Sequence, residues 1–203
     1  MDTQQAAHNL ASYIYGLEEL DIDKKINSTY GHMGATISDA ILQAGLNYEN
    51  VVSPRINRIL NIYTNFKSTS DFIYLLNIHG AKKILQWRHD EKPRRVRVLA
   101  EELYRNSVET EQDLMVWLRD DKNCKSLLLL NGIGPKTVDY IKLLVNVPAI
   151  AVDRHIRRFV SNAGINKTKY EDIREIVSMT ADILDIPYRT LDHAIWKFVA
   201  LSD

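Results

Sequence analysis

A glycine-rich turn between two apolar helical patterns constrains the fold of this chain more than any other feature. The turn is Asn-Gly-Ile-Gly-Pro at residues 131–135, within the segment LLLLNGIGPKTVDYIKLLVNVPAIAVDRHIRRF at residues 127–159. Glycines on both sides of one aliphatic residue allow positive φ and close backbone approach. Pro135 fits the first turn of a following helix, where its missing N–H would have no partner. The segment therefore predicts a helix, a tight hairpin, a second helix, a short crossing and a third helix that opens at Asp153.

The hairpin also predicts an anion-binding site. The first N–H groups of a helix have no partner within the helix, and the helix dipole places partial positive charge there. Phosphate is the usual anion at such a position. Residues 122–169 contain nine Lys or Arg residues and only two acidic ones, although the net charge of the whole chain is zero. For a second basic segment, residues 82–97, a solvated helix face is the simpler interpretation.

Two motifs together resemble one family of DNA-repair enzymes. The sequence LNGIGPKT is followed by AVDRHI, with 17 residues from Lys136 to Asp153. This pattern resembles the helix-hairpin-helix DNA glycosylases, the superfamily that includes endonuclease III and 8-oxoguanine DNA glycosylase. The close match covers about residues 127 to 160. The resemblance implies a DNA glycosylase with abasic-site lyase activity, in which Lys136 is the Schiff-base nucleophile and Asp153 is the catalytic carboxylate.

The resemblance further implies an all-α, two-lobed fold with the active cleft between the lobes. An internal helical bundle is expected over residues 31–145, with the helix-hairpin-helix at about 122–145. Residues 1–30 and 146–203 would form the second lobe. The expected DNA-binding residues are Asn131, Gly132, Ile133, Gly134, Pro135, Thr137, Gln43, Arg154 and His155.

A lysine and an aspartate suit base excision chemically. Cleavage of an N-glycosidic bond develops positive charge on the sugar, which a carboxylate stabilises. A neutral lysine amine can attack C1′ and form a Schiff base, but with its ordinary pKa only about 0.1% of lysine is neutral near pH 7.4. We therefore expect the helix N-terminus and partial burial to lower the pKa of Lys136, or Asp153 to accept its proton.

Each assignment has a simpler alternative. Asp153 stands where a plain helix N-cap would also be acidic, and the two roles are compatible. Lys136 could contact phosphate only, which would leave a monofunctional glycosylase, and the hairpin alone would suit a non-catalytic DNA-binding protein. His155 could be a packed residue. Gln43 lies roughly where endonuclease III-like proteins have a DNA-inserting glutamine, or it is an exposed helix-end residue.

Helical periodicity accounts for the rest of the chain, and no alternating strand of convincing length is found. We predict a first helix over residues 4–20 and a short helix over residues 36–44 that ends at Gly45. The expected N-cap signals are Ser53 with Pro54, Ser70, and Thr110 with Asp113 as a capping box.

Composition limits the cofactors and the setting. No cysteine follows Cys124, so an iron–sulfur cluster is not expected, and the six histidines show no zinc-ligand spacing. The resemblance suggests a K⁺ or Na⁺ ion on the hairpin backbone. The single cysteine and the lack of a long apolar run favour an intracellular, cytoplasmic protein without a membrane segment. The expected partner is double-stranded DNA with a damaged or mismatched base, bound by a monomer, and the hairpin does not specify which base is excised.

Overall fold

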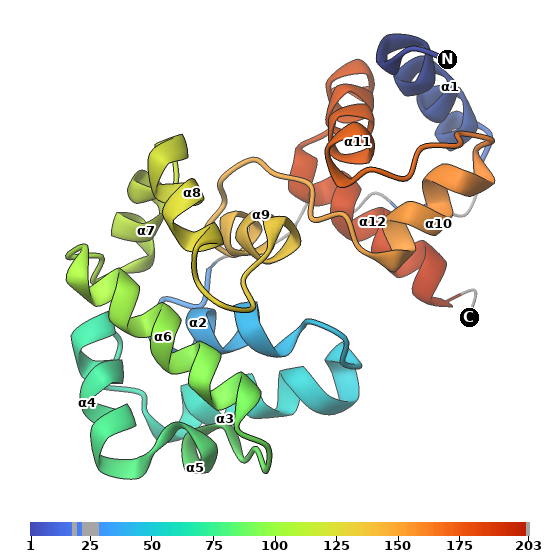
Figure 1. Ribbon diagram of the computed structural model, residues 1–203. Helices are drawn as coiled ribbons and strands as arrows, with labels where there is room; N and C mark the ends of the chain where they lie inside the picture. The colour runs from blue at the N-terminus through green and yellow to red at the C-terminus, as the bar shows by residue number, and fades with distance from the viewer. Residues whose placement is uncertain (18–19, 22–28, 202–203) are drawn as a thin grey trace. The chain divides into compact units, whose positions relative to one another are not determined.

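The computed structural model describes residues 1–17, 20–21 and 29–201, which form α-helices, one short π-helical turn and no strand (Figure 1). The all-α prediction is thus confirmed for this part of the chain. Contacts divide the chain into two compact units, Met1–Asn27 with Pro148–Asp203, and Ser28–Val147. The inner bundle predicted from the sequence covers residues 31–145.

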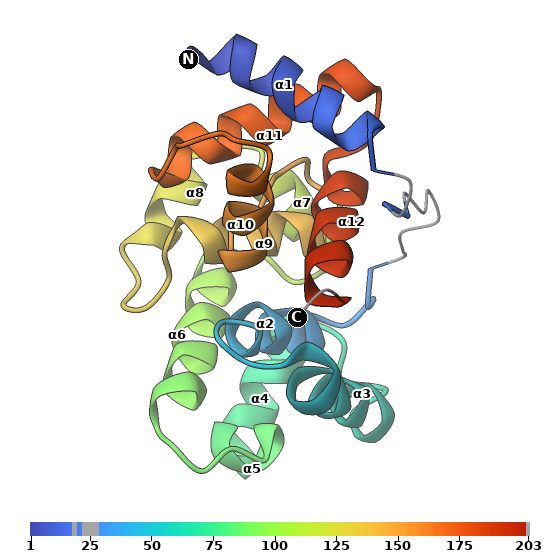
Figure 2. The same ribbon diagram turned by 90° about the vertical axis from the view of Figure 1, so that its right-hand side faces the viewer.

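The inner unit is built around α2 (Met33–Leu42), whose ten residues are all buried. Helices α3, α4, α6 and α9 pack against α2, as Figures 1 and 2 show. Small side chains allow this close packing: a Cβ on Gly34 would lie 2.6 Å from the Phe72 ring. The other elements of this unit are η1 (Tyr48–Val52), α3 (Ser53–Ile62), α4 (Thr69–His79), α5 (Ala81–Leu85), α6 (Glu91–Arg105), α7 (Glu111–Trp117), α8 (Asp121–Leu128) and α9 (Pro135–Leu144).

The outer unit joins the two ends of the chain. Helix α1 (Thr3–Tyr15) packs against α11 (Tyr170–Leu184), and α10 (Arg154–Asn162) packs against α12 (Tyr188–Leu201). Phe159 is fully buried at the centre of this unit and makes edge contacts with the rings of Tyr13 and Phe198 at 5.4 and 5.9 Å. The helix that opens at Asp153 therefore belongs to a second, separate hydrophobic core.

Several predicted helix ends differ from the structure. The first helix ends at Tyr15, and residues 18–19 of the predicted range lie outside the described residues. Helix α4 is capped by Ser68 and not by Ser70, because Ser68 and Asp71 form a capping box. The capping box of Thr110 with Asp113 is confirmed.

Two further ends depend on local structure that the sequence patterns did not indicate. The helix predicted at residue 36 begins at Met33, because the His32 side chain accepts a hydrogen bond from the Ala35 N–H and acts as the N-cap. Helix α3 has no side-chain cap at its start, because the π-helical turn of η1 runs directly into Ser53. Ser53 is therefore not the N-cap that the sequence predicted.

Candidate functional site

The hairpin between α8 and α9 is anchored by a buried side chain, that of Ile133. Gly132 has a φ of 85°, in the left-handed region that favours glycine. Ile133 is only 5% exposed, and its N–H donates to the Leu130 carbonyl at 3.0 Å. Gly134 is the extended N-cap of α9, with Pro135 in the first turn and no side-chain cap on the helix in the described part of the chain. The buried Ile133 thus fixes a turn that leads into a helix start without a competing side-chain acceptor.

The side chain of Arg95, on α6, packs against the hairpin at Gly132. A Cβ added to Gly132 would overlap the Arg95 guanidinium, with the Arg95 Cδ only 2.8 Å away. Arg95 Nη2 donates to Glu91 Oε1 at 2.7 Å, while its buried Nε has no hydrogen-bond partner among the described residues. The basic segment at residues 82–97 is therefore not simply a solvated face, because Arg95 packs against the predicted anion site.

Lys136 is held by Gln43, 93 positions earlier in the chain. Lys136 Nζ donates to Gln43 Oε1 at 2.8 Å, and Gln43 is the C-cap of α2. Gln43 is half-buried, and its Nε2 has no acceptor in the part of the chain that the structure describes. The interpretation of Gln43 as an exposed helix-end residue is thus wrong, while a role in DNA contact stays a prediction.

Lys92 of α6 reaches the same end of α2. Its Nζ donates to the carbonyls of Ile41, Leu42 and Ala44 at 2.9, 3.2 and 2.9 Å. Burial, and then the charges of Arg95 and Lys136, lower the pKa of Lys92 to about 8. Sequence reasoning missed this residue, since its partners are backbone atoms that no side-chain pattern reveals.

A buried carboxylate lies one helical turn from the Lys136 contact. Asp39 is fully buried and accepts hydrogen bonds from the hydroxyls of Tyr30 at 2.8 Å and Tyr140 at 3.3 Å. Burial raises its pKa to about 6, although the two tyrosine hydrogen bonds oppose that shift. Asp39 precedes Gln43 by four residues on α2, and Tyr140 follows Lys136 by four on α9. Since residues four apart share a helix face, the Asp39–Tyr140 and Gln43–Lys136 contacts are successive links between α2 and α9.

The tyrosine network extends beyond Asp39. The hydroxyls of Tyr30 and Tyr48 lie 3.1 Å apart, so Tyr30 links the Asp39 carboxyl group to a third phenol. Burial raises the pKa of both Tyr30 and Tyr140, and the Asp39 charge adds to this effect. Both phenols are therefore neutral donors near physiological pH.

Asp153 caps α10 in the outer unit. Its Oδ1 accepts from the N–H groups of His155 at 2.8 Å and Ile156 at 3.0 Å, which confirms the N-cap interpretation. Its Oδ2 lies 2.8 Å from His155 Nδ1, and Arg154 Nε donates to the other ring nitrogen of His155 at 3.4 Å. His155 is 9% exposed and meets the Trp196 ring at its edge. The carboxylate and the imidazole thus form one packed pair at the helix start.

The remaining predicted DNA-binding residues fall into two groups. Asn131, Pro135 and Arg154 are exposed, as DNA contact requires. The side chains of Ile133 and Thr137 are buried, so only their backbone groups are available to a ligand. This corrects any expectation that these two side chains touch DNA.

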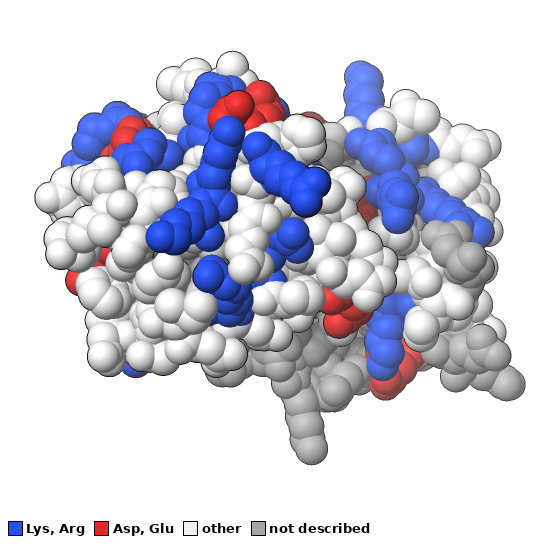
Figure 3. Space-filling model, turned by 90° about the horizontal axis from the view of Figure 1, so that it is seen from below, with Lys and Arg blue, Asp and Glu red and all other residues white. Residues whose placement is uncertain are grey.

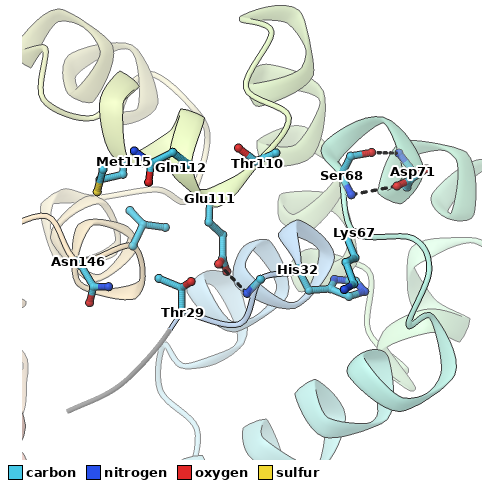
Figure 4. Close-up of a pocket in the computed structure, with 12 residues that line it drawn as sticks. Thr29, His32, Lys67, Ser68, Asp71, Thr110, Glu111, Gln112, Met115 and Asn146 are labelled. Atoms are coloured by element: carbon cyan, nitrogen blue, oxygen red, sulfur yellow. Dashed lines mark hydrogen bonds between the residues drawn. The ribbon is translucent and has the colours of Figure 1, made fainter. Parts of the chain in front are cut away.

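A cavity of about 590 Å³ lies elsewhere in the inner unit (Figure 4). Its wall includes Glu111, which is 7% exposed and accepts hydrogen bonds from the Gly31 N–H at 2.7 Å and from the Thr36 hydroxyl. Glu111 thereby ties the start of α7 to the segment before α2. None of the predicted site residues lines this cavity.

Figure 3 shows a face on which Lys and Arg side chains gather and outnumber acidic ones. Within residues 1–17, 20–21 and 29–201, no three His, Cys, Asp or Glu side chains form a group suited to a metal ion. In the same ranges no helix is long and apolar enough to cross a membrane.

Comparison with known proteins gives a family without an assigned activity. Residues 9–200 match the family described as "Domain of unknown function (DUF8548)", and the chain belongs to that family. No curated protein and no solved structure matches the chain.

Proposed function

We propose that this protein is a base-excision DNA glycosylase with abasic-site lyase activity. The observation that carries the proposal is the placement of the Lys136 amine, one residue past Pro135 and hydrogen-bonded at 2.8 Å to Gln43. An amine in that place stands next to the start of α9, where a DNA phosphate would be held by backbone N–H groups. The sugar attached to a phosphate gripped there is within reach of a lysine side chain.

In the proposed reaction, Lys136 attacks C1′ of the damaged nucleotide. The amine lone pair forms the new bond while the electrons of the C1′–N bond leave with the base, which takes up a proton. Loss of a proton from the nitrogen and opening of the sugar ring give the Schiff base. Removal of a C2′ proton then expels the 3′ phosphate by β-elimination. Asp153, as a carboxylate, would stabilise the positive charge that develops on the sugar.

The two-lobed glycosylase architecture is part of this proposal. Lys136 belongs to the unit Ser28–Val147, and Asp153 belongs to the unit formed by both chain ends. In this proposal the damaged nucleotide is extruded from the duplex and must reach both residues. Gln43 supports the role of Lys136, because its Oε1 accepts a hydrogen bond from the Lys136 amine and holds it in place.

A K⁺ or Na⁺ ion on the hairpin backbone is part of the proposal. Leu129, Asn131 and Gly132 at the tip are exposed, and backbone carbonyl oxygens are the ligands that K⁺ accepts in other proteins. A K⁺ or Na⁺ ion held by this tip would add positive charge near the DNA backbone. Double-stranded DNA with a damaged or mismatched base is the proposed partner, bound inside the cell by a monomer without an iron–sulfur cluster.

Borohydride trapping on a duplex with one abasic site tests the proposal. The wild-type protein should form a covalent complex and nick the strand. Lys136→Gln and Lys136→Arg should both abolish trapping and nicking, and Lys136→Arg should retain DNA binding because it keeps the positive charge. Trapping by either variant would show that another amine reacts.

The same assay separates the alternatives. A wild-type protein that removes a base from a panel of single-lesion duplexes, but neither traps nor nicks, is a monofunctional glycosylase. One that only binds duplexes, with binding that weakens as salt is added, is a DNA-binding module that uses the hairpin alone.

A further inference from the structure

We propose that Lys92 is a positioning residue for Lys136: its ammonium group supplies a fixed positive charge next to the Lys136 amine and thereby favours the neutral, nucleophilic form of that amine. This inference rests on the proposed function, because only the lyase reaction needs Lys136 as a nucleophile. A cation beside a lysine is a general way to activate its amine.

The geometry brings both lysines to one short segment. Lys92 Nζ donates to the carbonyls of residues 41, 42 and 44, while Lys136 Nζ donates to the side chain of residue 43 between them. Lys92 comes from α6 and Lys136 from α9, and both helices pack against α2. The end of α2 is therefore held from two sides by two amines.

The Lys92 ammonium group is held in place by hydrogen bonds and keeps its charge near neutral pH. An ammonium group has three N–H donors, and here three carbonyls accept them. These carbonyls belong to the C-terminal end of α2, where the helix dipole favours a cation. With a pKa of about 8, lowered first by burial and then by Arg95 and Lys136, Lys92 remains mostly protonated at pH 7. The repulsion from Lys136 that lowers this pKa acts equally on Lys136.

Other charged groups near the two lysines act in both directions. On α6, Arg95 adds to the positive charge, and Glu91 is exposed and hydrogen-bonded to Arg95 and Arg94. On α2, the buried Asp39 carboxylate is hydrogen-bonded to the hydroxyls of Tyr30 and Tyr140. Tyr140, the α9 residue that contacts Asp39, is neutral.

The remaining charged groups of these helices make contacts of their own, and Asp139, buried three residues after Lys136 on α9, adds a negative charge on that helix. On α3, Arg55 and Arg58 donate to the carbonyls of Val51 and Ile84. On α4, Asp71 is part of the cap at Ser68. Between α8 and the later part of α9, the charges of Asp121, Asp139 and Lys142 act on Cys124. Lys92 is thus the group whose removal tests the electrostatic effect on Lys136 most directly.

The test measures borohydride trapping against pH, in single turnover with protein in excess over an abasic-site duplex. In Lys92→Met, the midpoint of the pH–rate profile should rise by about one pH unit, which makes trapping about tenfold slower below the midpoint. Lys92→Arg, which keeps the charge, should stay close to the wild type.

A charge-matched control lies on the same helix. Arg105→Gln removes one positive charge at the end of α6, about 20 Å from Lys92 by helix rise, where the Arg105 side chain is 63% exposed and paired with Glu102. The Arg105→Gln variant should leave the midpoint of the pH–rate profile unchanged. A uniform loss of rate in Lys92→Met, with the wild-type midpoint, would mean that Lys92 only supports the fold and would overturn the inference.

A second measurement keeps this inference distinct from the proposed function. An amine-reactive reagent is applied to the DNA-free protein over a range of pH, and modification of Lys136 is quantified by mass spectrometry. Lys136 should react at lower pH in the wild type than in Lys92→Met. Equal profiles would refute the role of Lys92 even if trapping succeeds. A shifted labelling profile in a protein that traps no abasic DNA would support the electrostatic effect and remove the lyase proposal, and with it the catalytic purpose assigned to Lys92.

Discussion

The side chain of Arg95 occupies the space that a Cβ on Gly132 would need. Because Gly132 also has a φ of 85°, Gly132→Ala should destabilise the protein by about 1–3 kcal/mol, from backbone strain and from displacement of Arg95. Urea unfolding would measure this loss. Arg95→Ala should relieve the steric part, so the cost of Gly132→Ala should be smaller in that background.

Gly45→Ala is the matched control for this pair. Gly45 has a φ of 75°, but a Cβ there would meet nothing within 4 Å. Gly45→Ala should lower the free energy of unfolding by about 1–2 kcal/mol through backbone strain alone. This loss should be the same in the Arg95→Ala background. If Arg95→Ala changes the destabilisation by Gly132→Ala and by Gly45→Ala to the same extent, the contact between Arg95 and the hairpin does not contribute to stability.

Because of Asp39, the free energy of unfolding should fall as pH rises from about 4 to 6. Its pKa is raised to about 6 in the folded protein from an ordinary 3.8, so the folded state binds more protons than the unfolded state in this window. The stabilisation is fully present below the unfolded value and is lost as pH rises through the folded one, by about 3 kcal/mol in total. Urea unfolding of Asp39→Asn and wild type at several pH values should show this slope only in the wild type.

Glu49→Gln provides the control for the Asp39 prediction. Glu49 is an exposed acid in η1 of the same unit, next to Tyr48 in sequence. Its replacement should leave the slope between pH 4 and 6 as in the wild type. A slope that persists in Asp39→Asn would show that other groups carry the proton uptake.

Two substitutions of Asp153 should separate its role as a helix cap from its proposed role in base removal. Asparagine also caps helices well, so Asp153→Asn should keep the hydrogen bonds to the N–H groups of His155 and Ile156 and cost little stability, while base removal falls strongly. Asp153→Ala should lose the cap as well, at about 1 kcal/mol. Base release from lesion duplexes and urea unfolding of both variants give the comparison. Full base removal by Asp153→Asn would leave Asp153 with only the role of a cap.

The central segment was readable from sequence because its signals are local. Gly132, Pro135 and Asp153 each act through their own backbone or through the next few residues, and the structure shows the positive φ, the helix start and the cap that these residue types predict. Helical periodicity also gave the all-α class. Helix starts such as Met33 were placed less well, because a histidine cap and a π-helical turn have weak sequence signals.

The surroundings of Lys136 could not be read in the same way. Gln43, Lys92 and Asp39 reach the site by packing of α2, α6 and α9, which are far apart in sequence. The partners of Lys92 are carbonyl oxygens, and every residue offers one. One available signal was Asp39 itself, since an acid within the otherwise apolar segment ISDAIL is costly to bury without donors.

The pairing of α1 with α11 imposes an order on folding during synthesis. Helix α1 ends at Tyr15 and its partner begins at Tyr170, so the whole inner unit leaves the ribosome between them. The apolar side chains of Leu10 and Ile14, buried in the finished protein, lack this cover until α11 has been synthesised. During synthesis these two side chains are therefore open to aggregation for as long as the inner unit is being made.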